Sequence, residues 1–242
     1  MISVFYAKWF APFYPSAPDE PGLDCNACLM VKPPKGPRRD EGPFKADLKC
    51  CTYLPFTTNV ALGSKSLTEK SGWPVRWAEA RARGVLTPLG LIPPSNDMDR
   101  GDFGRDAKLL CPFYDNGGCA IWDHRSAVCA NYVCMSKAGE EGLAFWAESE
   151  ELGNRLEWAL AHLVLWQIGF TTTDTDAMSE LAASGDRAGA AASFGEWVGR
   201  EEELFAKCRQ VADGLDTDAI MEILGDDEEL LMVSLQKRRS QM

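Results

Sequence analysis

The chain has 242 residues, 45% of them hydrophobic, which is enough to bury the core of one large domain or two small ones. Its net charge of −11 argues against nucleic acid as a partner, because phosphates need a basic face. No apolar run approaches the length of a membrane span, and the first 11 residues lack the basic start and cleavage site of a signal peptide. We therefore expect a cytoplasmic protein with neither a membrane nor a nucleic acid as partner; a protein partner is allowed but not identified.

Charge and cysteines are distributed unevenly along the chain. Residues 1–140 carry 17 Lys and Arg against 15 Asp and Glu and hold eight of the nine cysteines, whereas residues 141–242 carry 8 against 21. In a reducing compartment, clustered cysteines bind metals more often than they form disulfides. We predict a cysteine-cluster metal-binding domain at 1–140 and an acidic helical domain at 141–242.

The first 24 residues are rich in aromatic residues and proline. We expect them to cover the metal site, since aromatic side chains supply large buried area, or alternatively to form one wall of a substrate cleft. Cys25 and Cys28 follow as a C-x-x-C pair, whose tight turn points two thiolates the same way. A redox dithiol would be followed by a helix, but residues 32–37 read as a proline-containing loop, so chelation is favoured.

Cys50 and Cys51 are adjacent in the sequence. In an extended strand their side chains would point to opposite faces, so either the chain turns there or each thiol serves a different site. Residues 74–83 are predicted as a short helix with an early proline and Gly84 at its end. Residues 93–106 are predicted as a polar loop.

Four cysteines surround the next turn. The segment 115–118, Asp-Asn-Gly-Gly, is typical of a hairpin turn, because Asn and Gly tolerate a positive φ. Such a hairpin would bring Cys111 and Cys119 together on neighbouring strands, and a second turn would bring Cys129 and Cys134 towards the same region. Four converging thiols predict a metal or iron–sulfur site.

These motifs resemble the YkgJ-like cysteine-cluster family of zinc- or iron-chelating (CxxCxxCC) proteins. The resemblance rests on the Cys-Cys pair, on residues 111–125 and on the two closing cysteines, and it covers about the first 135 residues. It implies an iron–sulfur cluster of the [4Fe–4S] type. Zinc is the alternative, because both accept an all-thiolate shell, at one site or two. The predicted metal ligands are up to eight cysteines: Cys25, Cys28, Cys50, Cys51, Cys111, Cys119, Cys129 and Cys134.

The predicted function is metal binding, and the alternative is an iron–sulfur enzyme. The resemblance extends to flagellin lysine methylases and iron–sulfur oxidoreductases, so the enzyme would be an oxidoreductase or a protein-lysine methylase-like protein. It would need a cleft beside the cluster, lined near Tyr14, Tyr53, Asp115 and Arg125. His124 is either a further ligand or a locally hydrogen-bonded side chain. The sequence shows no S-adenosylmethionine motif, phosphate loop or dinucleotide fingerprint.

The second half is predicted to be helical, because apolar residues recur there at spacings of three and four. Cys208 lies on one such apolar face and is expected to be a core residue. The fold class is α+β and mainly α, with an irregular cysteine-rich module, a short β-hairpin and a C-terminal helical bundle. The expected helical segments are 142–169, 177–192 and 196–215, followed by a last helical region that starts at Asp216, is interrupted at Gly225 and restarts over 226–239.

Overall fold

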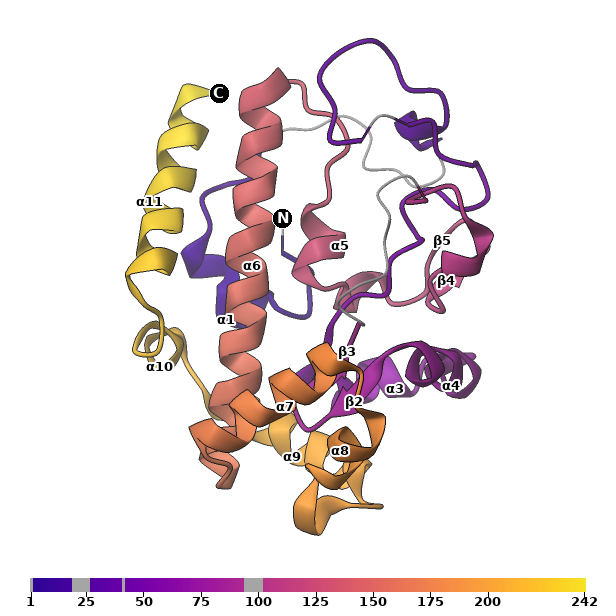
Figure 1. Cartoon of the computed structure of the whole chain (residues 1–242). Helices are drawn as coiled ribbons and strands as arrows, with labels where there is room; N and C mark the ends of the chain where they lie inside the picture. The colour runs from indigo at the N-terminus through magenta and orange to yellow at the C-terminus, as the bar shows by residue number, and fades with distance from the viewer. Residues whose placement is uncertain (1, 19–26, 41, 94–101) are drawn as a thin grey trace. The chain divides into compact units, whose positions relative to one another are not determined.

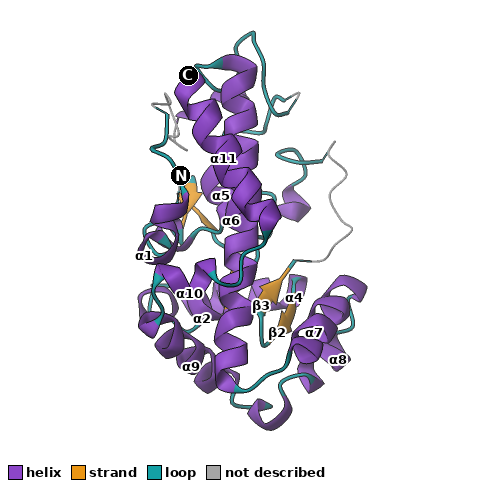
Figure 2. Cartoon of the chain, turned by 90° about the vertical axis from the view of Figure 1, so that its left-hand side faces the viewer, coloured by secondary structure: helices purple, strands orange, loops and turns teal. Residues whose placement is uncertain are grey.

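The computed structural model describes residues 2–18, 27–40, 42–93 and 102–242. The fold is mainly helical, with 57% helix, 5% strand and two small antiparallel sheets, which confirms the expected mainly helical α+β class (Figure 2). Among the residues described, no helix is both long and apolar enough to cross a bilayer. The chain forms two compact units. Unit 1 comprises Met1–Tyr53, Met98–Arg155 and Leu224–Met242, and unit 2 comprises Leu54–Asp97 and Leu156–Ile223.

Each unit takes segments from both sides of residue 140. Unit 1 includes the last helix of the chain, and unit 2 includes residues 54–97 from the cysteine-bearing half. The compact units therefore do not follow the step in charge and cysteine content. The predicted domains 1–140 and 141–242 stay a prediction about which parts fold independently.

Unit 1 combines irregular loops with two long helices (Figure 1). Its loops contain 3-10 turns at Ala11–Phe13, Leu29–Val31, Ala107–Leu109 and Trp122–His124. The helices and strands of this unit are α1 (Ala7–Phe10), β4 (Tyr114–Asp115), β5 (Gly118–Cys119), α5 (Ala127–Asn131), the first part of α6 (Gly139–Ile168) and α11 (Asp226–Gln241).

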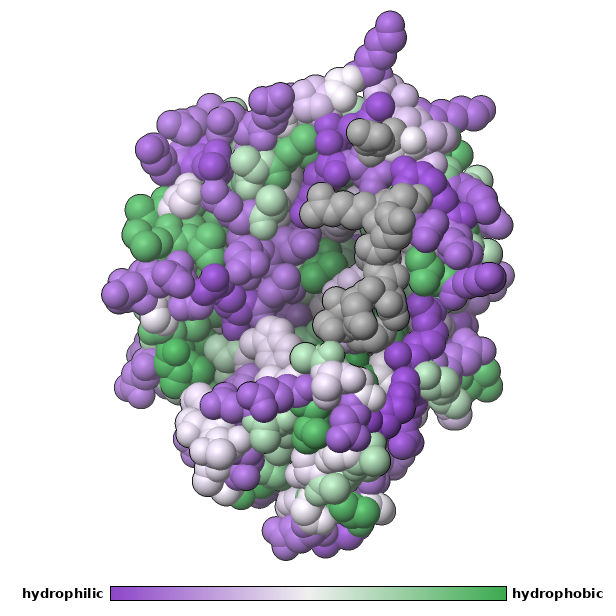
Figure 3. Space-filling view, viewed as in Figure 1, coloured by the Kyte–Doolittle hydropathy of each residue, from purple (hydrophilic) through white to green (hydrophobic). Residues whose placement is uncertain are grey.

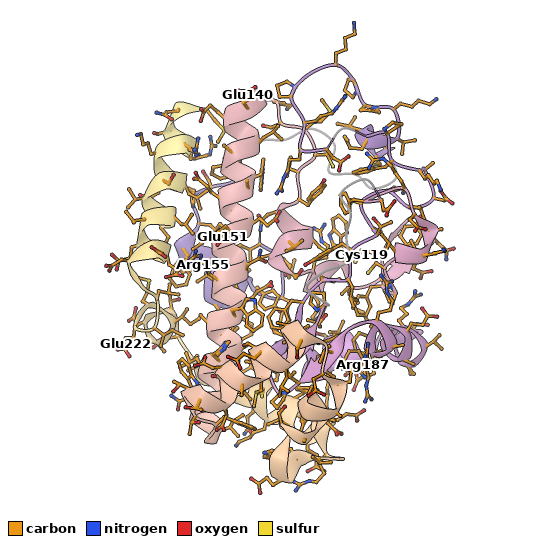
Figure 4. The ribbon with its side chains drawn as sticks, viewed as in Figure 1. Cys119, Glu140, Glu151, Arg155, Arg187 and Glu222 are labelled. Carbon is orange, nitrogen blue, oxygen red and sulfur yellow. The ribbon has the colours of Figure 1, made fainter. Side chains whose placement is uncertain are left out.

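Helices α6 and α11 lie side by side in unit 1 (Figures 1 and 2). Arg238 on α11 donates to Glu141 at 2.7 Å and to Glu148 at 2.8 Å, both on α6. Arg155 on α6 pairs with Glu151 on the same helix at 2.8 Å and with Glu228 on α11 at 3.0 Å. Figure 4 labels the Glu151–Arg155 pair. Ion pairs at both ends of α11 thus join it to α6.

The N-terminal aromatic segment contributes buried side chains to unit 1. Tyr6, Trp9 and Phe10 on and beside α1 are almost fully buried, and the Tyr6 and Phe10 rings are stacked. The backbone N–H of Phe5 donates to the Asp123 carbonyl at 2.9 Å, which fixes α1 against the turn that follows the hairpin. The described part of this segment therefore supplies buried area, and its predicted place over a metal site stays a prediction.

Unit 2 contains a three-stranded antiparallel sheet with strand order β1-β3-β2 and the remaining helices. Leu86 pairs with Leu91 and Thr57 also pairs with Leu91, so β3 is the central strand. The elements are β1 (Thr57–Thr58), α2 (Asn59–Leu62), α3 (Lys65–Thr68), α4 (Trp73–Arg83), β2 (Val85–Thr87), β3 (Gly90–Ile92), the end of α6, α7 (Thr172–Ser184), α8 (Arg187–Ala192), a 3-10 turn at Gly195–Trp197, α9 (Glu201–Gly214) and α10 (Thr217–Met221).

Asn59 ties three parts of unit 2 together. Its amide Nδ2 donates to the carbonyls of Pro88 at 3.1 Å and Ala161 at 3.0 Å, and its Oδ1 accepts from the Val60 N–H at 2.8 Å. The side chain is fully buried and uses both amide protons. It therefore fixes α2 against the β2–β3 turn and against α6.

Two predicted helices are shorter than expected. The segment 177–192 is divided between α7 and α8, because Gly185 takes φ 73° and ends α7. The segment 196–215 becomes helical only at Glu201, after Gly199 with φ 78°. Helix α6 covers nearly all of the predicted helical segment 142–169, and α4 covers the predicted segment 74–83. Cys208 is fully buried on α9, as expected.

The face of the protein in Figure 3 is mostly hydrophilic, and hydrophobic residues form separate patches on it. Exposed large apolar side chains among the described residues include Leu230 and Val233 on α11.

Candidate metal centre

One group of thiols packs around a small aromatic core in unit 1. Met30, Phe44 and Phe103 form this core, and their neighbours include Cys28, Cys50 and Cys134, which come from three separate parts of the chain. The Phe44 and Phe103 rings meet edge to face at 5.3 Å, and the Phe44 N–H donates to the Met30 carbonyl at 2.7 Å. The core therefore holds three cysteine-bearing loops against one apolar surface.

Cys28 has the local geometry expected of a chelating loop. The backbone N–H groups of Met30 and Val31 face its sulfur and act to lower its pKa. Burial has the larger effect and leaves the pKa of Cys28 raised. N–H groups directed at sulfur stabilise a thiolate, and a thiolate is the form that binds metal. Cys25, the predicted partner in the C-x-x-C pair, lies outside the described residues.

Cys50 and Cys51 lie at a turn. The preceding residue, Lys49, takes a left-handed φ of 55°, and the Cys51 N–H donates to the Leu48 carbonyl at 3.1 Å. The two thiols touch: the hydrogen bond from Cys50 to Cys51 is the largest effect raising the pKa of Cys50, followed by burial. Of the two arrangements predicted for this pair, the structure shows the turn.

The hairpin forms as predicted, but Cys111 lies outside its strands. Strands β4 and β5 pair Tyr114 with Cys119 and Asp115 with Gly118. Cys111 precedes β4, where its carbonyl accepts from the Tyr114 N–H at 2.9 Å, so Cys111 and Cys119 are not cross-strand partners. The expectation that both lie on strands was wrong for Cys111, because the strands are only two residues long.

A second group of neighbouring thiols includes Cys129 on α5. Burial raises the pKa of Cys129 well above its usual range, and the nearby thiols of Cys111, Cys119 and Cys50 raise it further. Cys119 is labelled in Figure 4. The Cys111 N–H donates to the Cys51 carbonyl at 2.7 Å, which joins the start of the hairpin to the Cys-Cys turn. Cys134 is different: its pKa is raised first by burial and then by Cys50 and Cys28.

Three cations lie beside these thiols. Lys49 is buried, and its Nζ donates to the Gly117 carbonyl in the hairpin turn at 2.7 Å. The Arg125 guanidinium lies 3.5 Å from the centre of the Trp122 ring and donates to the Cys129 carbonyl at 3.4 Å. Arg39 lies over the Tyr132 ring, and its charge lowers the pKa of Cys134 against the effect of burial.

The residues expected to line an enzyme cleft have local roles. The Tyr14 hydroxyl donates to the Ser149 carbonyl on α6 at 3.0 Å, and Tyr53 packs against the aromatic core. Asp115 is exposed and accepts from the Asn116 amide at 3.0 Å. His124 is buried against the Phe5 ring, with ring centres 4.7 Å apart.

The described thiols are neighbours, but they do not converge on one point. Within residues 2–18, 27–40, 42–93 and 102–242, no three His, Cys, Asp or Glu side chains are placed to hold a single metal ion. No disulfide joins any of the described cysteines. The donor chemistry thus fits a thiolate-bound metal, while ligation would still have to draw the sulfurs together.

Sequence reasoning missed Lys49, Arg39 and the Met30–Phe44–Phe103 core. The position of Lys49 directly before a Cys-Cys pair was a sequence signal for a cation beside the thiols. The Met30–Phe44–Phe103 core had no such signal, because it depends on contacts between distant loops. Comparison of the chain with family models, curated proteins and solved structures finds no match.

Proposed function

We propose that this protein binds a metal, as an iron–sulfur cluster of the [4Fe–4S] type or alternatively as zinc, through the cysteines of unit 1. The observation that carries the proposal is that these thiols have other thiols as neighbours. Cys129 lies near Cys111 and Cys119, and Cys134 lies near Cys28 and Cys50. Such grouping of soft donors matches the ligands that zinc and iron–sulfur clusters use.

Without a metal these thiols favour the protonated form. Burial and neighbouring thiols raise the pKa of Cys50, Cys129 and Cys134, so each resists forming the thiolate. A bound cation reverses this penalty, because it replaces the protons and compensates the negative charge. Reduced thiols are required, which fits a cytoplasmic protein.

The two metals differ in what they require of the loops. A tetrahedral zinc ion with Zn–S bonds of about 2.3 Å would hold its sulfurs about 3.8 Å apart. A cluster receives its thiolates at separate irons. The resemblance to the YkgJ-like cysteine-cluster family favours iron, and it also supports the cysteine-rich part of unit 1 as the metal-binding module.

Metal and acid-labile sulfide analysis of protein purified without oxygen tests the proposal. We expect iron with sulfide and a broad visible charge-transfer band, or zinc without sulfide. Cys111→Ala and Cys119→Ala should each lower the metal content. Cys208→Ala is the matched control, since Cys208 is fully buried on α9 in unit 2. Wild-type protein that binds neither metal after reconstitution would refute the proposal, as would unchanged metal content in Cys111→Ala.

A further inference from the structure

Helix α11 has a second face, which does not pack against α6. We infer that this face docks a second copy of the chain, and that the two α11 helices pack antiparallel about a twofold axis. Four exposed residues form the surface, and we call them the α11 stripe: Asp226, Leu230, Val233 and Lys237. The inference goes beyond metal binding and does not depend on it, because the stripe contains none of the cysteines.

The face of α11 that packs on α6 is defined by three of its residues. Leu235 is fully buried, Glu228 pairs with Arg155 at 3.0 Å, and Arg238 pairs with Glu148 at 2.8 Å. Positions 228, 235 and 238 lie on one side of the helix, because residues three and seven apart are neighbours on its surface. At about 100° per residue, the α11 stripe lies on roughly the opposite side. Binding a second helix there would leave the contacts with α6 intact.

The centre of the α11 stripe is apolar and faces solvent. Leu230 is 66% exposed and Val233 is 65% exposed. Figure 3 shows hydrophobic surface over α11 at the left edge of the molecule. The four stripe positions follow each other at spacings of four, three and four, which is the spacing of residues in the seam between two packed helices. The stripe therefore has the pattern of an interhelical seam, and burying its apolar centre against another apolar surface would be favourable.

The charges of the stripe identify the partner as a second copy of the same helix. The stripe begins with the acid Asp226 and ends with the base Lys237, and neither side chain forms an ion pair with any described residue. In an antiparallel pair, Leu230 of one copy faces Val233 of the other. Asp226 of each copy then faces Lys237 of the other, because the stripe is symmetric about its centre. A parallel pair would instead place like charges opposite each other.

The dimer formed in this way is expected to be weak. One helical stripe from each copy buries much less than the roughly 800 Å² per partner of a standard stable interface. The net charge of −11 also makes two copies repel each other, although at physiological salt this repulsion is screened beyond about 8 Å. We therefore expect a dissociation constant in the range of about 0.1–1 mM, which calls for measurements at high concentration.

Sedimentation equilibrium of the full-length chain under reducing conditions tests the surface. At concentrations up to about 1 mM, the wild type should fit a monomer–dimer equilibrium. Val233→Glu should raise the dissociation constant at least about tenfold, because it places a charge in the centre of the seam. Val75→Glu is the matched control, since Val75 on α4 is a valine with nearly the same exposure, 66%, and should leave the equilibrium unchanged.

Two charge reversals test the antiparallel register. Asp226→Lys and Lys237→Glu should each weaken self-association, because each places like charges opposite each other twice across the axis. An equal mixture of the two variants should dimerise about as well as the wild type, since every facing pair is then of opposite charge. Glu140→Lys also reverses an acid in the first turn of an exposed helix, and its mixture with Lys237→Glu should not regain the dimer.

The outcomes separate the surface from its register. A wild type that stays monomeric at about 1 mM would overturn the inference, and the stripe would then be open to another partner. An unchanged dissociation constant in Val233→Glu would overturn it as well, as would a mixture of the two charge variants that stays monomeric. If circular dichroism shows that Val233→Glu does not fold, the mixture decides. None of these results bears on the metal content, so the proposed metal binding is tested separately.

Discussion

Replacing Asn59 by aspartate should destabilise unit 2 strongly, although the two side chains have nearly the same shape. Asn59→Asp replaces an NH₂ group that donates to the carbonyls of Pro88 and Ala161 with an oxygen 3.0–3.1 Å from both. A buried carbonyl left without its donor costs about 1–3 kcal/mol. Ala161 lies inside α6 and retains its helical partner, so Pro88 carries most of this cost. With the repulsion between oxygens added, we expect a loss of about 3 kcal/mol at neutral pH.

The assay is urea unfolding, combined with thiol labelling of Cys208 followed by mass spectrometry. Burial removes the Cys208 thiol from solvent and raises its pKa to about 12, so its labelling reports the opening of unit 2. The same substitution at exposed Asn116 is the control and should change stability by less than about 0.5 kcal/mol.

A dependence on pH checks the cause of the Asn59→Asp effect. The introduced carboxyl should have a folded-state pKa above its unfolded value of about 3.9, so the deficit is complete above the folded pKa. As pH falls towards about 4, the deficit should shrink. A loss below about 1 kcal/mol, or one independent of pH, would show that the Asn59 amide does not bear this role.

Two further predictions concern unit 2. Gly63→Ala should lower the free energy of unfolding by about 3 kcal/mol or more, because a Cβ there would overlap the Phe205 carbonyl on α9. Gly214→Ala is the control: its Cβ meets nothing within 4 Å, so it should be neutral or slightly stabilising, and equal effects of the two variants in urea unfolding would contradict the packing argument. His162 lies on α6, with its Nδ1 2.7 Å from the Trp158 carbonyl oxygen. Burial lowers its pKa, so the unfolded chain binds the proton more readily than the folded chain. Stability from this source is complete above the unfolded pKa of about 6.5 and falls below it; His162→Gln should remove that part of the slope, and an unchanged slope would reject the assignment.

The helices show what hydrophobic periodicity can predict. The spacing of apolar residues located α6, and the glycines at 84 and 169 end helices as predicted. The break between α7 and α8 was missed because the six alanines between residues 182 and 192 favour a continuous helix. A local signal was nevertheless present: Gly185 takes the left-handed conformation, and Asp186 then caps α8 by accepting from the Gly189 N–H. Adjacent Gly and Asp mark the end of one helix and the start of the next.

The candidate site was less predictable, because its geometry depends on contacts between distant segments. Asn116 takes a φ of 45°, and the Asp-Asn-Gly-Gly turn forms where the sequence indicated. Neither the position of Cys111 before the strand nor its bond to the Cys51 carbonyl follows from local patterns. A turn at the Cys-Cys pair was one of the two predicted alternatives, but the left-handed φ of Lys49 that makes it could not be predicted, since lysine has no propensity for a positive φ.

The same contacts explain why irregular loops and a long helix belong to one unit. Strands of two residues cannot fix thiol positions through backbone pairing alone. Side chains supply the missing restraint: Arg39 pairs with Glu150 on α6 at 2.7 Å, while its own N–H holds the Cys134 loop. Tyr14 makes a second connection to α6 through the Ser149 carbonyl. Helix α6 therefore anchors the cysteine-bearing loops, and a bound metal would add a direct link between thiols that the polypeptide connects only through these contacts.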